Sequence, residues 1–197
     1  SYSQKQNINN KPRTPRRIYM KECERLGVAG ERVITETTKG VSLDGGVSLK
    51  NKGLGDKQIQ AFAEGVGAMF IRHLDLSNNR ILEEKTSVAI LSKLDPFIIQ
   101  KLDLSKNRLT SKSFKILTKL VGESTNLLNL GLEESNLLTP SLKELMEAIC
   151  RREVCPATDV VIYECPLKVL NLAGNNIDDK GAKIIAKAIP KCKNLLR

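Results

Sequence analysis

Residues 71–81 read IRHLDLSNNRI, and the same phrase returns as IQKLDLSKNRL at 99–109, LLNLGLEESNL at 127–137 and LKVLNLAGNNI at 167–177. Each copy fits the pattern L-x-x-L-x-L-x-x-N-x-L. A weaker copy, DGGVSLKNKGL, begins at residue 44, and Leu195 stands where a sixth copy would open. Self-similarity at a period near 28 residues is the signature of a stacked repeat array, so the chain is predicted to be a solenoid.

Each repeat reads as a short strand followed by a helix. Alternate leucines such as Leu74 and Leu76 would point to one side of a strand. The following residues have helical periodicity, for example Phe114, Leu117 and Leu120. A helical crossover lets successive strands lie parallel. The predicted fold class is therefore α/β, a curved solenoid with parallel strands on its concave face and helices on its convex face.

Asparagine recurs where the chain leaves each predicted strand, at Asn79, Asn107 and Asn175. A buried amide can donate to and accept from main-chain groups that the turn would otherwise leave without partners. We expect these amides to stack from one repeat to the next. The third strong copy has Ser135 at this position, and a looser turn is expected there because a hydroxyl offers fewer hydrogen bonds.

The repeat phrase resembles the ribonuclease-inhibitor-like class of leucine-rich repeat proteins over residues 44–197. That class includes enzyme inhibitors, innate immune receptors, GTPase activators, actin-capping proteins and axonemal subunits, so the resemblance implies a fold but no single function. Ahead of the repeats, residues 17–28 read RIYMKECERLGV. This run is similar to the opening of leucine-rich repeat proteins associated with cilia, the axonemal dynein regulatory complex and centrosomes.

Three segments are predicted. Residues 1–17 form an extended basic tail, residues 18–43 form a helical cap, and residues 44–197 form the repeats, with an insertion at about 153–165. Tyr19, Cys23 and Leu26 are spaced to line one helix face over the first repeat. In the insertion, Val160 to Tyr163 would pack under the adjoining helix or meet a partner. The interrupted sixth copy indicates that the array continues beyond residue 197.

The net charge of +10 is concentrated at the two ends. Residues 1–21 and 180–197 each hold six cations and no acid, whereas residues 22–179 hold 20 cations and 22 acids. A polyanion such as tubulin, which is strongly acidic, would be attracted to the N-terminal cations. A solubilising or nuclear-import-like tail is the alternative. The predicted polyanion-binding residues are Lys11, Arg13, Arg16, Arg17 and Lys21. At the other end, a stripe formed by Lys180, Lys183, Lys187 and Lys191 is interpreted as a solvated helix exterior.

Few residues suggest catalysis or metal binding. Asp75 and Asp103 are expected on adjacent strands, where two carboxylates could act as an acid–base pair, but this repeat class commonly has aspartate there. His73 is the only histidine. The spacing of Cys150, Cys155 and Cys165 does not match a zinc motif, and a phosphate-binding loop is missing. We therefore predict a non-enzyme without metal or cofactor. Five cysteines, an odd number, favour free thiols in a reducing compartment.

The favoured function is a non-enzymatic protein-binding scaffold, in a ciliary axoneme or another microtubule assembly, with tubulin or axonemal subunits as partners. The predicted location is cytoplasmic and cytoskeletal. Neither a membrane span nor specific nucleic-acid binding is expected. Regulation of a Ran-like GTPase through Arg80 or Arg108 is the alternative, and an actin-binding or innate-immune ligand-binding module is a third possibility. The predicted partner-binding residues on the concave face are Lys50, His73, Asp75, Lys101, Asp103, Lys106, Glu133 and Asn171.

Overall fold

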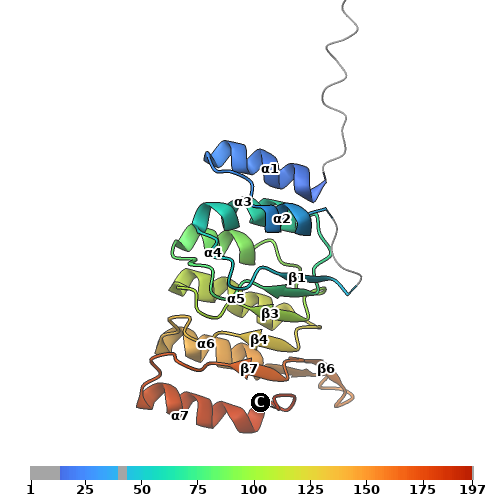
Figure 1. Ribbon diagram of the computed structural model, residues 1–197. Helices are drawn as coiled ribbons and strands as arrows, with labels where there is room; N and C mark the ends of the chain where they lie inside the picture. The colour runs from blue at the N-terminus through green and yellow to red at the C-terminus, as the bar shows by residue number, and fades with distance from the viewer. Residues whose placement is uncertain (1–13, 40–43, 197) are drawn as a thin grey trace, which may run out of the picture.

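The computed structural model describes residues 14–39 and 44–196, which fold as the predicted solenoid (Figure 1). Its sheet has five parallel strands in the order β1-β2-β3-β4-β7, and the leucines of successive repeats stand in register, as Leu74 does with Leu102. The strands are β1 (Gly46–Ser48), β2 (His73–Asp75), β3 (Lys101–Asp103), β4 (Asn129–Gly131) and β7 (Val169–Asn171).

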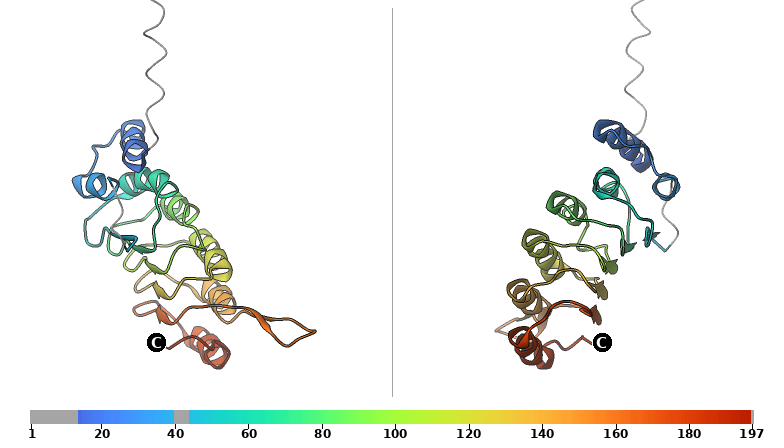
Figure 2. Two further views of the ribbon diagram at one scale, coloured as in Figure 1. Left: turned by 90° about the vertical axis from the view of Figure 1, so that its right-hand side faces the viewer. Right: turned by 60° about the vertical axis from the view of Figure 1, so that its left-hand side comes forward.

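The helices form a second layer on one side of the sheet (Figure 2). Packed helices need 8–10 Å of separation whereas paired strands need about 4.8 Å, so stacking the repeats curves the array and places the sheet on its concave side. No helix among the described residues is long and apolar enough to cross a membrane. The helices of this layer are α3 (Asp56–Val66), α4 (Glu84–Leu91), α5 (Ser111–Glu123), α6 (Thr139–Ile149) and α7 (Asp179–Ala188), followed by the 3₁₀ turn η1 (Ile189–Lys191).

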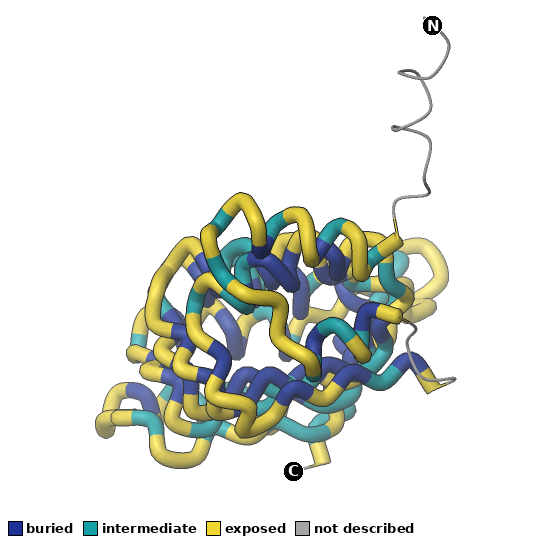
Figure 3. Tube along the Cα trace, turned by 45° about the horizontal axis from the view of Figure 1, so that its top comes forward, coloured by how far each residue is buried: buried dark blue, intermediate teal, exposed yellow. Residues whose placement is uncertain are grey.

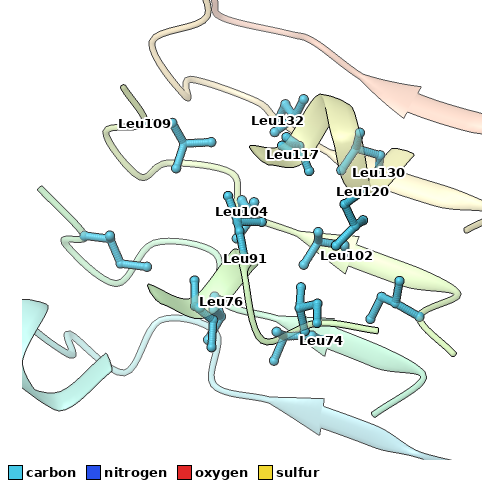
Figure 4. Close-up of a cluster of buried hydrophobic side chains, with 14 of the residues drawn as sticks. Leu74, Leu76, Leu91, Leu102, Leu104, Leu109, Leu117, Leu120, Leu130 and Leu132 are labelled. Carbon is cyan, nitrogen blue, oxygen red and sulfur yellow. The ribbon is translucent and has the colours of Figure 1, made fainter. Parts of the chain in front are cut away.

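The core lies between the sheet and the helices (Figure 3). Leu74, Leu102 and Leu130 are each 1% exposed, and their side chains meet leucines from the helices, such as Leu117 (Figure 4). This arrangement confirms the predicted inward set. Burial of a complete leucine side chain contributes roughly 1.5–3 kcal/mol, so repetition of one leucine pattern supplies a continuous apolar core.

The N-terminal cap consists of α1 (Pro15–Leu26) and α2 (Arg32–Thr37), and α1 packs on α3 (Figure 1). Tyr19 and Cys23 are buried and Leu26 is half-buried against the core, as the periodicity predicted. The Tyr19 hydroxyl donates to Gln58 Oε1 at 2.7 Å and accepts from the Glu31 amide at 2.9 Å. Burial is the main cause that raises the pKa of Tyr19 well above its usual range.

The helix begins earlier than the sequence analysis predicted. Residues 15–17 were expected to be extended, but they form the first turn of α1. The Thr14 hydroxyl accepts from the Arg17 amide at 3.3 Å, and Pro15 occupies a first-turn position that needs no amide hydrogen. This N-terminal capping signal was present in the sequence and outweighs the extended character suggested by the prolines.

The insertion is an antiparallel hairpin rather than an irregular loop. Strands β5 (Arg152–Val154) and β6 (Val161–Glu164) pair with each other, and the hairpin reaches out from the solenoid (Figure 2). Val160, Val161 and Ile162 are exposed, so they do not pack under the adjoining helix. Tyr163, the last residue of that apolar run, packs against the core: its hydroxyl donates to the Ser124 carbonyl at 3.3 Å, and burial raises its pKa to about 12.

Two of the five cysteines form a disulfide in the structure, whereas the odd number had predicted free thiols. Cys150 at the end of α6 is bonded to Cys192, 42 residues later and beyond η1. The stacking of α7 on α6 brings these distant positions together, which their separation in sequence does not reveal. Cys23, Cys155 and Cys165 are free.

The predicted asparagine stack is present. The Asn107 amide donates to the carbonyl of Leu76 in the preceding repeat at 2.9 Å and to that of Leu104 in its own turn at 3.1 Å. Its Oδ1 accepts from the amides of Asn79 and Ile81, both at 3.2 Å. One buried side chain thus satisfies main-chain groups of two successive repeats.

The stack changes at Ser135, which is completely buried. Its hydroxyl donates to the Leu132 carbonyl at 2.8 Å. It does not supply the acceptor that an asparagine Oδ1 at this position offers to the amides of the preceding turn. The Leu109 amide instead donates to the Ser135 carbonyl at 3.1 Å, and the Arg108 amide donates to the Ile81 carbonyl at 2.9 Å. The turn at 107–109 is therefore held by main-chain bonds in place of side-chain ones.

Replacing Asn107→Ala should lower the free energy of unfolding by about 3 kcal/mol, because several buried main-chain groups lose their only side-chain partner at once. Urea unfolding followed by circular dichroism measures the change. Asn176→Ala, at an exposed position two repeats further along the chain, is the matched control and should change stability by less than about 0.5 kcal/mol. Equal effects of the two substitutions would contradict the structural role of the stack.

Alkylation of the unreduced, unfolded chain should label three cysteines, and prior reduction should raise the count to five. Mass spectrometry gives both counts. Reduction should also destabilise the fold by up to ~4 kcal/mol, the chain-entropy value for a cross-link across 42 residues. Five labelled cysteines without reduction would contradict the bond between Cys150 and Cys192.

Candidate functional site on the concave face

The outward side chains of the strands line a shallow groove of about 470 Å³ on the concave face. Five of the eight predicted partner-binding residues contribute to it: His73, Asp75, Lys101, Asp103 and Asn171. Ser48, Asn129 and Val169 also line the groove, although they were not among the predicted residues. The same alternation of inward and outward positions could have identified them, because each occupies an outward position on its strand.

Asp75 and Asp103 stand directly opposite each other in register, as expected. Each carboxylate nevertheless accepts a hydrogen bond from the main chain of its own repeat: Asp75 Oδ1 from the Ser77 amide and Asp103 Oδ1 from the Ser105 amide, both at 2.9 Å. Asn171 Oδ1 accepts from the corresponding amide of its repeat, that of Ala173, at 3.0 Å. These side chains hold the ends of their strands, which supports the interpretation of the aspartates as ordinary repeat residues.

Gly131 makes room for one of these carboxylates. A Cβ atom at position 131 would lie 2.5 Å from Asp103 Oδ1, which is closer than atoms can approach. Glycine at the central outward position of β4 therefore lets the Asp103 side chain extend across the neighbouring strand. Both residues line the groove, so the Asp103 carboxylate lies in its floor over β4.

Two more of the predicted residues, Lys106 and Glu133, form a polar cluster with Asn171. Lys106 Nζ lies 3.0 Å from Glu133 Oε1, and Asn171 Nδ2 donates to Glu133 Oε2 at 3.2 Å. The hydrogen bond from Lys106, followed by that from Asn171, holds the pKa of Glu133 below its usual range. Lys50 is exposed and adds a smaller electrostatic effect in the same direction.

His73 shows no catalytic arrangement. Its neighbours in register are Gly46 and Lys101, as the repeat spacing predicted. Its Nδ1 lies 4.0 Å from Asp44 Oδ2, which gives an ion pair only when the imidazole is protonated. Within residues 14–39 and 44–196, no group of three or more histidine, cysteine or acidic side chains is placed to hold a metal ion.

The predicted polyanion-binding residues divide into two sets. Lys11 and Arg13 lie outside the described residues. Arg16, Arg17 and Lys21 are exposed on α1, so they are held on a folded helix rather than on an extended tail. The electrostatic field of Arg16 also reaches Glu36 of α2, where it is a minor cause of a lowered pKa after the hydrogen bond from Lys39.

The two arginines of the GTPase alternative lie where the chain leaves the strands. Arg80 and Arg108 are both exposed. Arg80 has a positive φ of 56°, an uncommon conformation for arginine, and it lies between Asn79 and Ile81, whose amides donate to the Asn107 side chain. Neither arginine forms an ion pair with another described residue.

Two profiles of the leucine-rich repeat match the sequence, one over residues 70–94 and one over residues 164–186. Among solved structures, the leiomodin-1 actin-binding site 2 is similar, with a TM-score of 0.59, 13% sequence identity and coverage of 89% of this chain and 90% of that chain. No characterised protein matches the sequence significantly. At 13% identity the structural likeness shows the fold alone. Together with the repeat geometry, these matches show a leucine-rich repeat fold, which typically serves in protein–protein interaction.

Lys106→Ala should raise the pKa of Glu133 toward its ordinary value, because it removes the strongest hydrogen bond to the ionised carboxylate. Since the folded-state pKa is lowered, any stability from this pair is present above the unfolded-state pKa and is lost as pH falls through the folded-state value. A carbon-13 NMR titration of the glutamates measures the shift. Lys112→Ala, on the convex face, is the control and should leave the Glu133 titration unchanged.

Proposed function

We propose that this chain is a non-enzymatic scaffold that binds a cytoskeletal protein through its concave face. The observation that carries the proposal is the groove whose polar side chains are already fixed by the repeats. Asp75, Asp103 and Asn171 are held by main-chain amides, and Glu133 is held by Lys106. A preorganised surface loses little side-chain entropy when a partner binds.

The shape of the groove favours a protein partner over a small molecule. It is shallow and crosses all five strands of the sheet, and small-molecule sites are normally concave pockets that enclose most of the ligand. Its charge is mixed, with Lys101 beside Asp103 in the same strand. Alternating charges can match a protein surface in a single register, which is a common source of specificity.

Two features favour a cytoskeletal partner. The first is the distribution of charge: the N-terminal segment is basic, and tubulin is a strongly acidic polymer. Together with the resemblance of residues 17–28 to ciliary proteins, this supports a microtubule assembly such as the axoneme. The second is the similar fold of the leiomodin-1 actin-binding site, which makes filamentous actin the second candidate.

Co-sedimentation with microtubules and, separately, with actin filaments tests this function. Truncation should remove residues 1–13 and keep Thr14, because Thr14 caps the helix that buries Tyr19. The concave-face variant is Lys50→Glu with Lys101→Glu. Its matched control is Lys57→Glu with Lys115→Glu, two exposed lysines on the convex helices α3 and α5.

The intact chain should pellet with microtubules at physiological salt, and the concave-face variant should bind at least about tenfold more weakly while the convex control changes less than twofold. If truncation also weakens binding, the N-terminal cations contribute to the affinity for the polymer. If the chain pellets with actin filaments but not with microtubules, the partner is the second candidate, filamentous actin. A chain that pellets with neither polymer, or a concave-face variant that binds as well as the control, would overturn the proposal.

A further inference from the structure

A second groove lies on the convex side, between α6 and α7. It has a volume of about 470 Å³. Its floor is apolar, with Met146 from α6 and Ile184 and Ala188 from α7, and its rim is mostly cationic. The cationic rim residues are Lys143, Lys187 and Lys191.

The groove follows the direction of the two helices. From α7, Ile184 and Ala188 are four residues apart on the floor, and Lys187 and Lys191 are four residues apart on the rim. Positions four residues apart lie on one helix face, separated by about one turn of 5–6 Å. The groove therefore presents an apolar strip beside a row of two cations, each about one helical turn long.

The charge on this rim differs from that between the other convex helices. Lys93, just after α4, pairs with Glu64 of α3 at 3.3 Å, and Lys112 of α5 pairs with Glu84 of α4 at 3.6 Å. At the α6–α7 junction the rim contains one acid, Glu147, which faces Lys143 on its own helix at 3.9 Å. Among the described residues, neither Lys187 nor Lys191 has a carboxylate within ion-pair distance.

Both ends of the groove are fixed by the fold. Near the start of α7 the two helices approach closely, since a Cβ atom on Gly181 would lie 3.2 Å from Leu142 Cδ2. Near the end of α6, Cys150 lines the groove and is bonded to Cys192 beyond η1. The space between the helices is thus a preformed feature rather than one that a ligand has to open.

We infer that this groove binds an acidic amphipathic helix of a partner protein. The apolar face of that helix covers Met146, Ile184 and Ala188, and two carboxylates one turn apart pair with Lys187 and Lys191. Laying the apolar face of a helix into a groove is a recurrent mode of peptide recognition, and the charge complementarity fixes its orientation. The surface faces away from the concave sheet, so this inference goes beyond the proposed function and can fail without affecting it.

A designed peptide of 18 residues tests the inference against the full chain. Leucines occupy one helical face, glutamates flank them at four-residue intervals, and a fluorescein at one end reports binding by anisotropy. A peptide of the same composition in scrambled order is the first control. The groove variant is Lys187→Glu with Lys191→Glu, and the matched variant is Lys57→Glu with Lys115→Glu, which reverses two exposed lysines of α3 and α5 outside the groove. Circular dichroism verifies that both variants fold.

The amphipathic peptide should bind the unmodified chain, and the scrambled peptide should bind at least tenfold more weakly. The groove variant should lose at least tenfold in affinity and the matched variant less than twofold. Ala188→Trp, which fills the floor without changing charge, should also weaken binding. Equal binding of both peptides, or equal loss in both lysine variants, would reduce the effect to general charge attraction and overturn the inference. It would also be overturned if phosphatidylserine-containing vesicles bound through Lys187 and Lys191 while the peptide did not.

Discussion

The array depends on the asparagines that occupy three of its strand-exit turns, Asn79, Asn107 and Asn175. A strand of three residues followed by a sharp turn leaves amides and carbonyls that no ladder can satisfy, and a buried group without a partner costs about 1–3 kcal/mol. Asn79, Asn107 and Asn175 each bond to the turn of their own repeat and to the repeat before it. The same interaction therefore ends β2, β3 and β7 and joins each of them to the repeat before it.

This constraint sets the shape of the two surfaces that we propose as binding sites, the concave groove and the groove between α6 and α7. With the strands held at one spacing and the helices requiring a wider one, the array has to curve, and its two faces differ in character. The concave face carries polar side chains fixed at the strand ends, such as Asp103 above Gly131. The convex face carries the groove between α6 and α7, where Lys187 and Lys191 have no carboxylate within ion-pair distance among the described residues, whereas Lys93 and Lys112 pair with acids of a neighbouring helix. Two separate candidate surfaces are consistent with the proposed scaffold function.

Much of the fold follows from local pattern, because each repeat makes the same contacts. The leucine positions, the asparagine stack, the register of Asp75 with Asp103 and the buried face of the cap helix were all predictable.

The features that sequence reasoning missed depend on particular neighbours. Pairing of Cys150 with Cys192 requires α7 to lie on α6, and the hairpin of residues 152–164 breaks the period with no repeat to compare it with. The prolines before Arg16 obscured the Thr14 cap. In the candidate site the outward residues could be named, but the bond from Lys106 to Glu133 crosses between repeats and depends on side-chain reach.

Amide hydrogen exchange measured residue by residue by NMR is the most direct test of the asparagine constraint. The amides of Ile81 and Leu137 donate to the side chains of Asn107 and Asn175, at 3.2 and 3.0 Å, and lie outside every helix and strand. If the stack holds the array together, both should exchange only through global unfolding, as slowly as amides in the middle of α5. Exchange of these two amides at the rate of exposed loop amides, with α5 still protected, would show that the turns open independently and would contradict the account.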